Sequence, residues 1–178
     1  MPPDKQRAQD LPPADLMIGD VRIPGRVLTA PMTGISDLPY RRAASRLGAA
    51  YVATEIVACE AFTRGRPDVV RRAAVGDGLP LMDVQLVEHE PRWIAQGAAM
   101  AEAAGAQIID LNMGCPAKEV TGALSGSALM RDLDLAERLI AAAVSATSRP
   151  VNPEDAPRPG RTEHKCTRAR LARRTGRR

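Results

Sequence analysis

The sequence predicts an α/β protein built around a parallel sheet. Between residues 20 and 150, short apolar segments that suit strands alternate with longer amphipathic segments that suit helices. The apolar segments are nearly continuous, which is typical of strands buried on both faces of a parallel sheet. This order fits either a (β/α)8 barrel or an open doubly wound sheet, and only about four strands, half of what a closed barrel needs, can be recognised.

The first elements follow from turn and capping signals. Residues 19–31 predict a short hairpin or strand pair, with Val27–Ala30 as the first strand of the sheet. Asp37 is a suitable N-cap for a helix over residues 38–47. Residues 51–57 are rich in side chains with high β propensity and predict the next strand.

The same order repeats through the rest of this region. Pro91 indicates a helix start, because proline is tolerated in the first helical turn. The candidate functional residues lie at or just past the carboxyl ends of predicted strands, where parallel sheets place their sites: Pro31, Met32, Glu55, Gln85, Asn112 and Cys115. The remaining predicted elements are a helix over 59–74, a strand over 81–86, a helix over 92–104, a strand over 107–111 and a helix over 133–147.

Charge divides the chain into two unlike parts. Residues 151–178 contain nine Lys or Arg and three Asp or Glu, a net charge of +6. Since the whole chain carries +4, residues 1–150 carry −2. The basic segment is rich in Arg, Pro and Gly, and Leu171 is its only large apolar residue after Val151. We therefore expect residues 151–178 to form a disordered, low-complexity tail.

Composition excludes several classes of protein. Three cysteines without metal-ligand spacing predict neither a disulfide framework nor a metal site, and they favour a reducing cytoplasmic location. The first residues lack the apolar core of a signal peptide, and no stretch approaches the ~20 apolar residues of a membrane helix. Only four aromatic residues are present, so a base-stacking platform for nucleic acid is not evident.

The most informative motif follows the apolar run 108–111. The chain there turns abruptly polar in Asn112-Met113-Gly114-Cys115-Pro116, which predicts a strand that delivers a thiol to the rim of a site. A single cysteine is more often a small core residue. The segment resembles, however, the active-site motif of the tRNA-dihydrouridine synthases. Residues 30–41, Ala-Pro-Met-Thr-Gly-Ile-Ser-Asp-Leu-Pro-Tyr-Arg, are similar to the first flavin-binding loop of that family.

The two motifs stand in the family's order and at about its spacing, most like the bacterial DusB branch. The resemblance implies a partial (β/α)8 TIM barrel, with residues 1–19 as an N-terminal segment and 20–150 as the N-terminal half of the flavin-binding barrel. It implies that FMN and NADPH reduce the C5=C6 bond of a uridine in tRNA. Cys115 would be the proton donor, a role that suits a thiol with a reference pKa of about 8.5.

The resemblance also implies the roles of other residues. Pro31, Met32 and Thr33 would hold the flavin through backbone contacts, and Gln85 would hydrogen-bond its ring. Asn112 would orient a carbonyl edge of the flavin or the uracil, since its amide both donates and accepts. Lys118 would meet a tRNA phosphate.

The chain departs from the family at residue 151. The family continues into a Val-Lys-x-Arg strand whose lysine contacts the flavin, whereas this chain reads Val151-Asn152-Pro153-Glu154. One hypothesis is a frameshift near residue 150, and the alternative is a natural basic arm for RNA. In either case we expect the truncated chain to be inactive. Other hypotheses are a barrel related to dihydroorotate dehydrogenase, a non-catalytic RNA-binding protein, or a degraded gene product.

Overall fold

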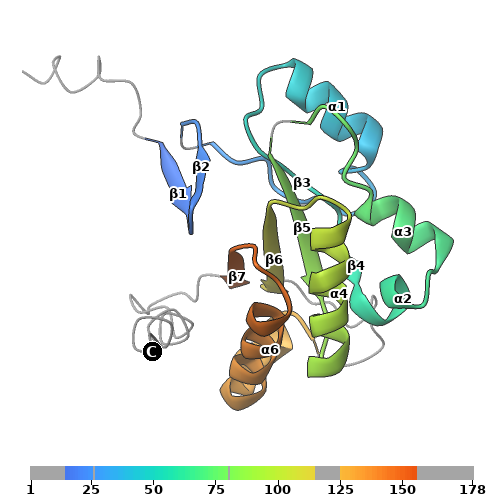
Figure 1. Ribbon diagram of the computed structural model, residues 1–178, viewed down its shortest axis with the longest axis vertical. Helices are drawn as coiled ribbons and strands as arrows, with labels where there is room; N and C mark the ends of the chain where they lie inside the picture. Colours follow the sequence, from blue (N-terminus) through green and yellow to red (C-terminus); the bar gives the residue numbers. More distant parts are fainter. Residues whose placement is uncertain (1–14, 26, 80, 115–124, 156–178) are drawn as a thin grey trace, which may run out of the picture.

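The predicted alternation of strands and helices around a parallel sheet is confirmed. In the computed structural model the strands lie in the order β3 (Val52–Ala53), β5 (Met82–Val87), β6 (Ile108–Met113) and β7 (Val151–Asp155), all of them parallel (Figure 1). A further short strand, β4 (Val57–Ala58), also pairs with β5. The structure describes residues 15–25, 27–79, 81–114 and 125–155.

Two helices pack against one face of this sheet. They are α4 (Pro91–Ala103) and α6 (Leu133–Ala146), which lie side by side (Figure 1) and end close to the predicted limits. Asp132 caps α6 by accepting a hydrogen bond from the Leu135 N–H at 2.9 Å. The short η1 helix (Ser127–Arg131) precedes it. Burial of one large aliphatic side chain contributes about 1.5–3 kcal/mol, so this layer is a main source of stability.

A hairpin covers the amino ends of the strands. It consists of β1 (Leu16–Ile18) and β2 (Val21–Ile23), so it starts before the predicted boundary at residue 19. Ile23 is fully buried against Tyr51 and Ile108. A Cβ on Gly19, at the hairpin turn, would lie 2.7 Å from the Pro150 side chain. The hairpin therefore leaves the carboxyl ends of the strands as the place for a site.

The prediction of a first strand over Val27–Ala30 is wrong. These residues form no regular element, and Val27 is 86% exposed. A strand needs a ladder partner along its length. Within the described part of the chain, no strand pairs with residues 27–30.

Two other predicted elements are each divided in the structure. The predicted strand over 51–57 forms β3 and β4, separated by three residues that lie outside any strand. The predicted helix over 59–74 forms α2 (Cys59–Thr63) and α3 (Pro67–Ala73). Gly65 lies between the helices with a φ of 71°, a left-handed conformation that ends α2, and Pro67 then begins α3. Helix α1 (Leu38–Arg46) forms as predicted, with Asp37 as its N-cap.

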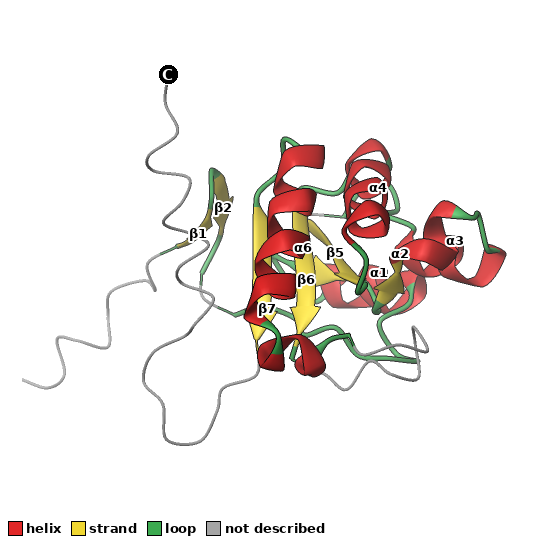
Figure 2. Ribbon diagram, turned by 90° about the horizontal axis from the view of Figure 1, so that it is seen from below, coloured by secondary structure: helices red, strands yellow, loops and turns green. Residues whose placement is uncertain are grey.

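The sheet continues past the predicted boundary at residue 150. Strand β7 runs to Asp155 and pairs in parallel with β6. Its register places Asn152 opposite Asp110 and Pro153 opposite Leu111. Figure 2 shows β5, β6 and β7 side by side. The first five residues assigned to the tail are thus part of the sheet. The rest of the predicted tail, residues 156–178, lies outside the described residues.

Candidate functional site

The strands β5 and β6 bury a row of polar side chains on the face opposite α4 and α6. Gln85 is 1% exposed, Asp110 is 4% exposed and Asn112 is 6% exposed. They alternate along the strands with the apolar residues that face the helices, as the two-residue period of a strand requires. Buried polar groups of this kind are costly unless hydrogen-bonded to one another.

These side chains form a continuous hydrogen-bonded network. The Asn112 Nδ2 donates to the Gln85 Oε1 at 3.0 Å, and the Gln85 Nε2 donates to the Asp110 Oδ2 at 2.7 Å. The Asn152 Nδ2 donates to the Asp110 Oδ1 at 2.8 Å. The structure therefore brings together Gln85 and Asn112, two of the residues predicted to contact a flavin.

The residues between β3 and β4 contact both segments that were predicted to bind the flavin, the loop after residue 30 and the strand that carries Gln85. Residues 54–56 stand opposite only two residues of β5, so they form a bulge that turns side chains in new directions. The Thr54 hydroxyl accepts the Gln85 N–H at 3.1 Å. The Glu55 carboxylate, 7% exposed, accepts the Gly34 N–H at 2.8 Å. Two neighbouring residues thus join the predicted flavin loop to the strand that carries Gln85.

The loop after residue 30 is held by hydrogen bonds among its own residues. The Met32 N–H donates to the Ser36 Oγ at 2.8 Å. The Met32 carbonyl accepts from the N–H groups of Ile35 at 3.1 Å and Ser36 at 2.9 Å. Backbone contact from Met32 to a flavin, as predicted, would have to replace these bonds. Pro31 and Met32 are half-buried and Thr33 is exposed, and the three roles stay predictions.

A buried arginine anchors the end of this loop. Arg41 of α1 is fully buried and its guanidinium donates to the carbonyl oxygens of Ser36 at 3.1 Å and Ala74 at 2.7 Å. Burial lowers the pKa of the Arg41 guanidinium, although nearby Asp37 and Glu55 oppose this shift. Arg41 thereby ties the loop to the end of α3, and its contacts are those of a structural residue.

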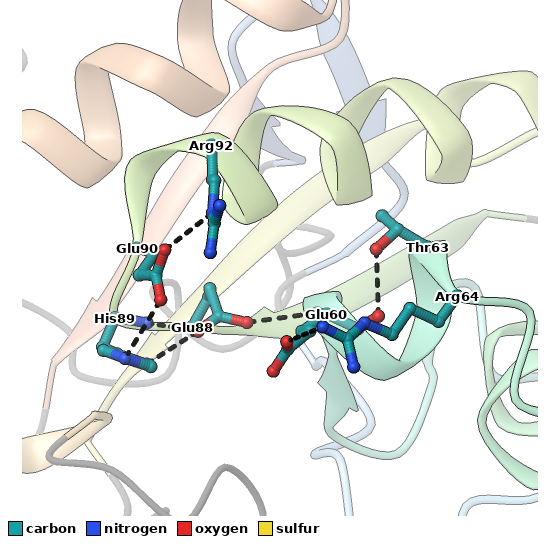
Figure 3. Close-up of polar contacts among 7 residues, drawn as sticks. All are labelled: Glu60, Thr63, Arg64, Glu88, His89, Glu90 and Arg92. Atoms are coloured by element: carbon teal, nitrogen blue, oxygen red, sulfur yellow. Dashed lines mark hydrogen bonds and ion pairs between the residues drawn. The ribbon is translucent and has the colours of Figure 1, made fainter.

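A second polar cluster lies at the end of β5 (Figure 3). The Glu88 carboxylate, 3% exposed, accepts the Glu60 N–H at the start of α2 at 3.1 Å and lies 2.8 Å from the His89 Nδ1. Arg64 and Arg92 flank the Trp93 ring at 5.6 and 4.6 Å, and each pairs with a neighbouring glutamate. Glu88 thus fastens α2 to β5.

The neighbouring thiol of Cys59 is suited to packing. It is fully buried, and burial together with the Glu88 charge raises its pKa well above the usual value. It therefore stays in the unreactive thiol form. Within the described residues, no group of His, Cys, Asp and Glu could hold a metal ion.

The structure also reveals supporting residues that the sequence reasoning did not single out: Thr54, Asp110 and Asn152. Asp110 could have been noticed, because a carboxylate inside the apolar run 108–111 needs buried partners. Thr54 gave no such signal, since its role depends on the bulge. Glu55 was a candidate only because it lies at the end of a predicted strand, and its bond to the loop at Gly34 was not predicted. Cys115 and Lys118, the predicted proton donor and phosphate contact, lie outside the described residues.

Comparison with known proteins decides between the fold-level alternatives. The family model for dihydrouridine synthase (Dus) matches residues 28–155, a range that contains both motifs and the polar network. The chain belongs to the dihydrouridine synthase family. The match favours this family over the dihydroorotate dehydrogenase-like alternative and confirms the resemblance stated from the two motifs.

Individual relatives agree with this membership. A probable tRNA-dihydrouridine synthase of Rickettsia conorii is 43% identical over 137 residues, 76% of this chain and 41% of the relative. One from Rhodobacter capsulatus is 46% identical over 138 residues, 76% of this chain and 42% of the relative. The tRNA-dihydrouridine synthase B of Xanthomonas campestris is 41% identical over 137 residues, again 76% of this chain and 41% of the relative.

The chain spans about two-fifths of the length of the curated relatives it matches. Its described part has a parallel sheet with helices on one face and a polar network on the other, which agrees with a partial TIM barrel. Among the described residues, no helix is long and apolar enough to cross a membrane.

Proposed function

We propose that this chain carries part of the active site of an FMN- and NADPH-dependent tRNA-dihydrouridine synthase. The observation that supports this most is the buried network of Gln85, Asp110 and Asn112 at the carboxyl side of the sheet, inside the range matched to the family. Parallel α/β sheets place their ligands at this edge. The proposed site is cytoplasmic and acts on tRNA.

The side chains of the network fit the ring of a flavin. The pyrimidine part of a flavin, like uracil, presents carbonyl acceptors on either side of an N–H donor. Gln85 and Asn112 carry amides, which both donate and accept, so they match such an edge. Pro31, Met32 and Thr33 would lie against the ring from the loop that Glu55 fastens to the sheet.

The chemistry needs a hydride and a proton at the two carbons of the uracil C5=C6 bond. When bound and reduced by NADPH, FMN supplies the hydride to C6. Cys115 would give its thiol proton to C5, acting as a general acid. Asn112, three residues earlier, would orient the uracil, and Lys118 would contact a phosphate of the tRNA.

A chimera tests this function. Residues 1–150 are joined to the remaining part of the Rhodobacter capsulatus relative, and dihydrouridine in tRNA is measured by mass spectrometry after incubation with FMN and NADPH. We expect product from the parent chimera. Cys115→Ala should lower turnover about 10²- to 10⁴-fold while the flavin spectrum is kept, because the proton donor is lost.

The matched control is Cys59→Ala, the same substitution at a buried cysteine that we assign to packing. It should leave turnover within a few-fold of the parent, since a small buried side chain contributes to stability rather than to proton transfer. Equal turnover in Cys115→Ala and the parent would contradict the proton-donor role. A chimera that binds FMN but forms no dihydrouridine would contradict the proposed reaction.

A further inference from the structure

Asp110 occupies the centre of the polar network. It lies on β6 between two neighbouring strands, and the sheet register places Gln85 of β5 and Asn152 of β7 directly opposite it. Each of its carboxylate oxygens receives a hydrogen bond from one of these amides, at 2.7 and 2.8 Å. The sheet itself therefore holds the three side chains in a fixed order.

A carboxylate at this position sets the direction of the hydrogen bonds described among Asp110, Gln85 and Asn112. Both oxygens of Asp110 accept in the structure, so the Gln85 amide turns its NH₂ group toward Asp110. The Gln85 oxygen then faces Asn112 and must accept the Asn112 NH₂ group. Asp110 thus fixes the orientation of Gln85 directly and that of Asn112 through Gln85.

Stability alone gives no reason for a charge in this place. Asp110 is 4% exposed, and burial of a carboxylate costs several kcal/mol before its hydrogen bonds are counted. Apolar side chains on the opposite face of the same strands are buried without that cost. What the carboxylate adds is a pair of acceptor atoms, which favours one direction for the Gln85 amide and, through it, for the Asn112 amide.

We propose that Asp110 is a positioning residue, which orients the Gln85 and Asn112 amides so that they meet the imide edge of a flavin or a uracil ring in one donor and acceptor order. The identity of the ligand in this inference rests on the proposed function. The orientation of the amides can be tested without any ligand.

The substitution Asp110→Asn removes this control while keeping the shape of the side chain. The new amide has one donor and one acceptor side, but both of its neighbours now present NH₂ groups. Either Asn152 turns over, or Gln85 and Asn112 both turn over. We expect a mixture of these states, and hence two orientations of the Gln85 amide.

A second substitution restores the control from the other strand. In Asp110→Asn/Asn152→Asp the carboxylate at position 152 accepts the NH₂ group of the new Asn, whose oxygen must then face Gln85. The orientation of Gln85 is the same as in the parent. The composition and the charge are also unchanged, which makes this variant a matched control for Asp110→Asn.

Both variants are made in the full 178-residue chain. NMR of the side-chain NH₂ groups should show one pair of signals for Gln85 in the parent and in the double variant, and two pairs or a large shift in Asp110→Asn. Circular dichroism melting checks that each variant is folded. An unchanged Gln85 signal in folded Asp110→Asn would overturn the positioning role.

Two separate titrations, one with FMN and one with uridine monophosphate, test whether the orientation of the amides affects ligand binding. They also show whether the imide edge that these amides meet belongs to a flavin or to a uracil. The ligand that uses this edge should bind about tenfold more weakly to Asp110→Asn, the effect of about one hydrogen bond, and recover in the double variant. Equal affinity in all three proteins would overturn the proposed link to the ligand. If the parent binds neither ligand while its Gln85 signal responds as expected, the proposed function fails and the orientation by Asp110 stands.

Discussion

The two faces of strands β5 and β6 are both buried, yet they are made of opposite chemistry. The face against α4 and α6 carries aliphatic residues such as Leu86 and Ile109, which are fully buried. The other face carries Gln85, Asp110 and Asn112, which are almost as deeply buried but hydrogen-bonded to one another. The two faces are therefore similar in burial and differ in the kind of interaction that their side chains make.

This difference assigns separate tasks to the two faces. Aliphatic contacts have no direction and stabilise any arrangement that excludes water. Hydrogen bonds in a buried network are directional, and a network of this kind adds little net stability while it selects one arrangement. The helix face accordingly holds the sheet together, and the polar face sets the geometry of the candidate site.

The largest effect on stability is expected from Leu86→Ala, which breaks the helix face. Loss of the buried side chain leaves a cavity between β5 and the helices, and it should lower the free energy of unfolding by about 2–5 kcal/mol. Urea denaturation measures this loss. Leu47→Ala is the control, because Leu47 is 89% exposed and should change stability little. Equal losses in the two variants would contradict the assignment.

A smaller loss is expected from Gln85→Leu, which breaks the polar face. The new side chain fits the volume but leaves Asp110 and Asn112 each without one partner, a cost of about 1–3 kcal/mol in unfolding free energy. Denaturation and FMN titration together measure it, and FMN binding should weaken. Gln96→Leu is the same change at an exposed position of α4. A Gln85→Leu protein as stable as Gln96→Leu would show that the network does not need Gln85.

The attachment of the helix layer to β7 should depend on pH. Glu102 of α4 accepts hydrogen bonds from the Ser148 hydroxyl, the Thr147 hydroxyl and the Ser148 N–H, and these lower its pKa from 4.5 to about 2. A lowered carboxyl pKa stabilises the fold above the unfolded value, so this contribution is present above pH 4.5 and disappears as the pH falls toward about 2.

Thermal melting at several pH values tests this with Glu102→Gln. The variant should melt at a lower temperature than the parent at neutral pH, because its amide offers only one acceptor atom. The difference should shrink as the solution becomes acidic, since the parent then loses the same charge. A difference that stays constant from neutral to strongly acid pH would contradict the role of Glu102.

The smallest effect on stability is expected at the outer edge of the sheet. The Ile109 N–H donates to the Pro150 carbonyl at 3.0 Å. Because backbone groups of successive strand residues point to opposite edges, residue 153 directs its nitrogen away from β6. Pro153 has no N–H there, which hinders the addition of another strand.

Pro153→Val should restore a donor at this edge and increase self-association, with little change in unfolding free energy. Sedimentation velocity over a range of concentrations measures the association. Pro24→Val is the control, because Pro24 is exposed and lies outside the strands. Association that rises equally in both variants would show that proline content, and not the edge of β7, controls it.

Much of the fold was predictable because its signals are local. Asp37, Pro91 and the amphipathic pattern of residues 133–147 mark helix limits through capping and periodicity, and the structure agrees within a few residues. The failures lie where a strand depends on its neighbours. Residues 27–30 have the composition of a strand but pair with none of the described strands, while residues 151–155 look like a tail but pair with β6.

The sequence by itself determined the family and the order of strands and helices, and it singled out Gln85 and Asn112 as candidates, because motifs and periodicity act over short stretches of chain. Only the tertiary structure decided that Asp110 and Asn152 join them and that the Thr54 hydroxyl supports Gln85. Those contacts depend on the register between strands and on one bulge. A shift of a single residue would turn the strand's side chains to the other face, and the register that prevents this is set between strands far apart in the sequence.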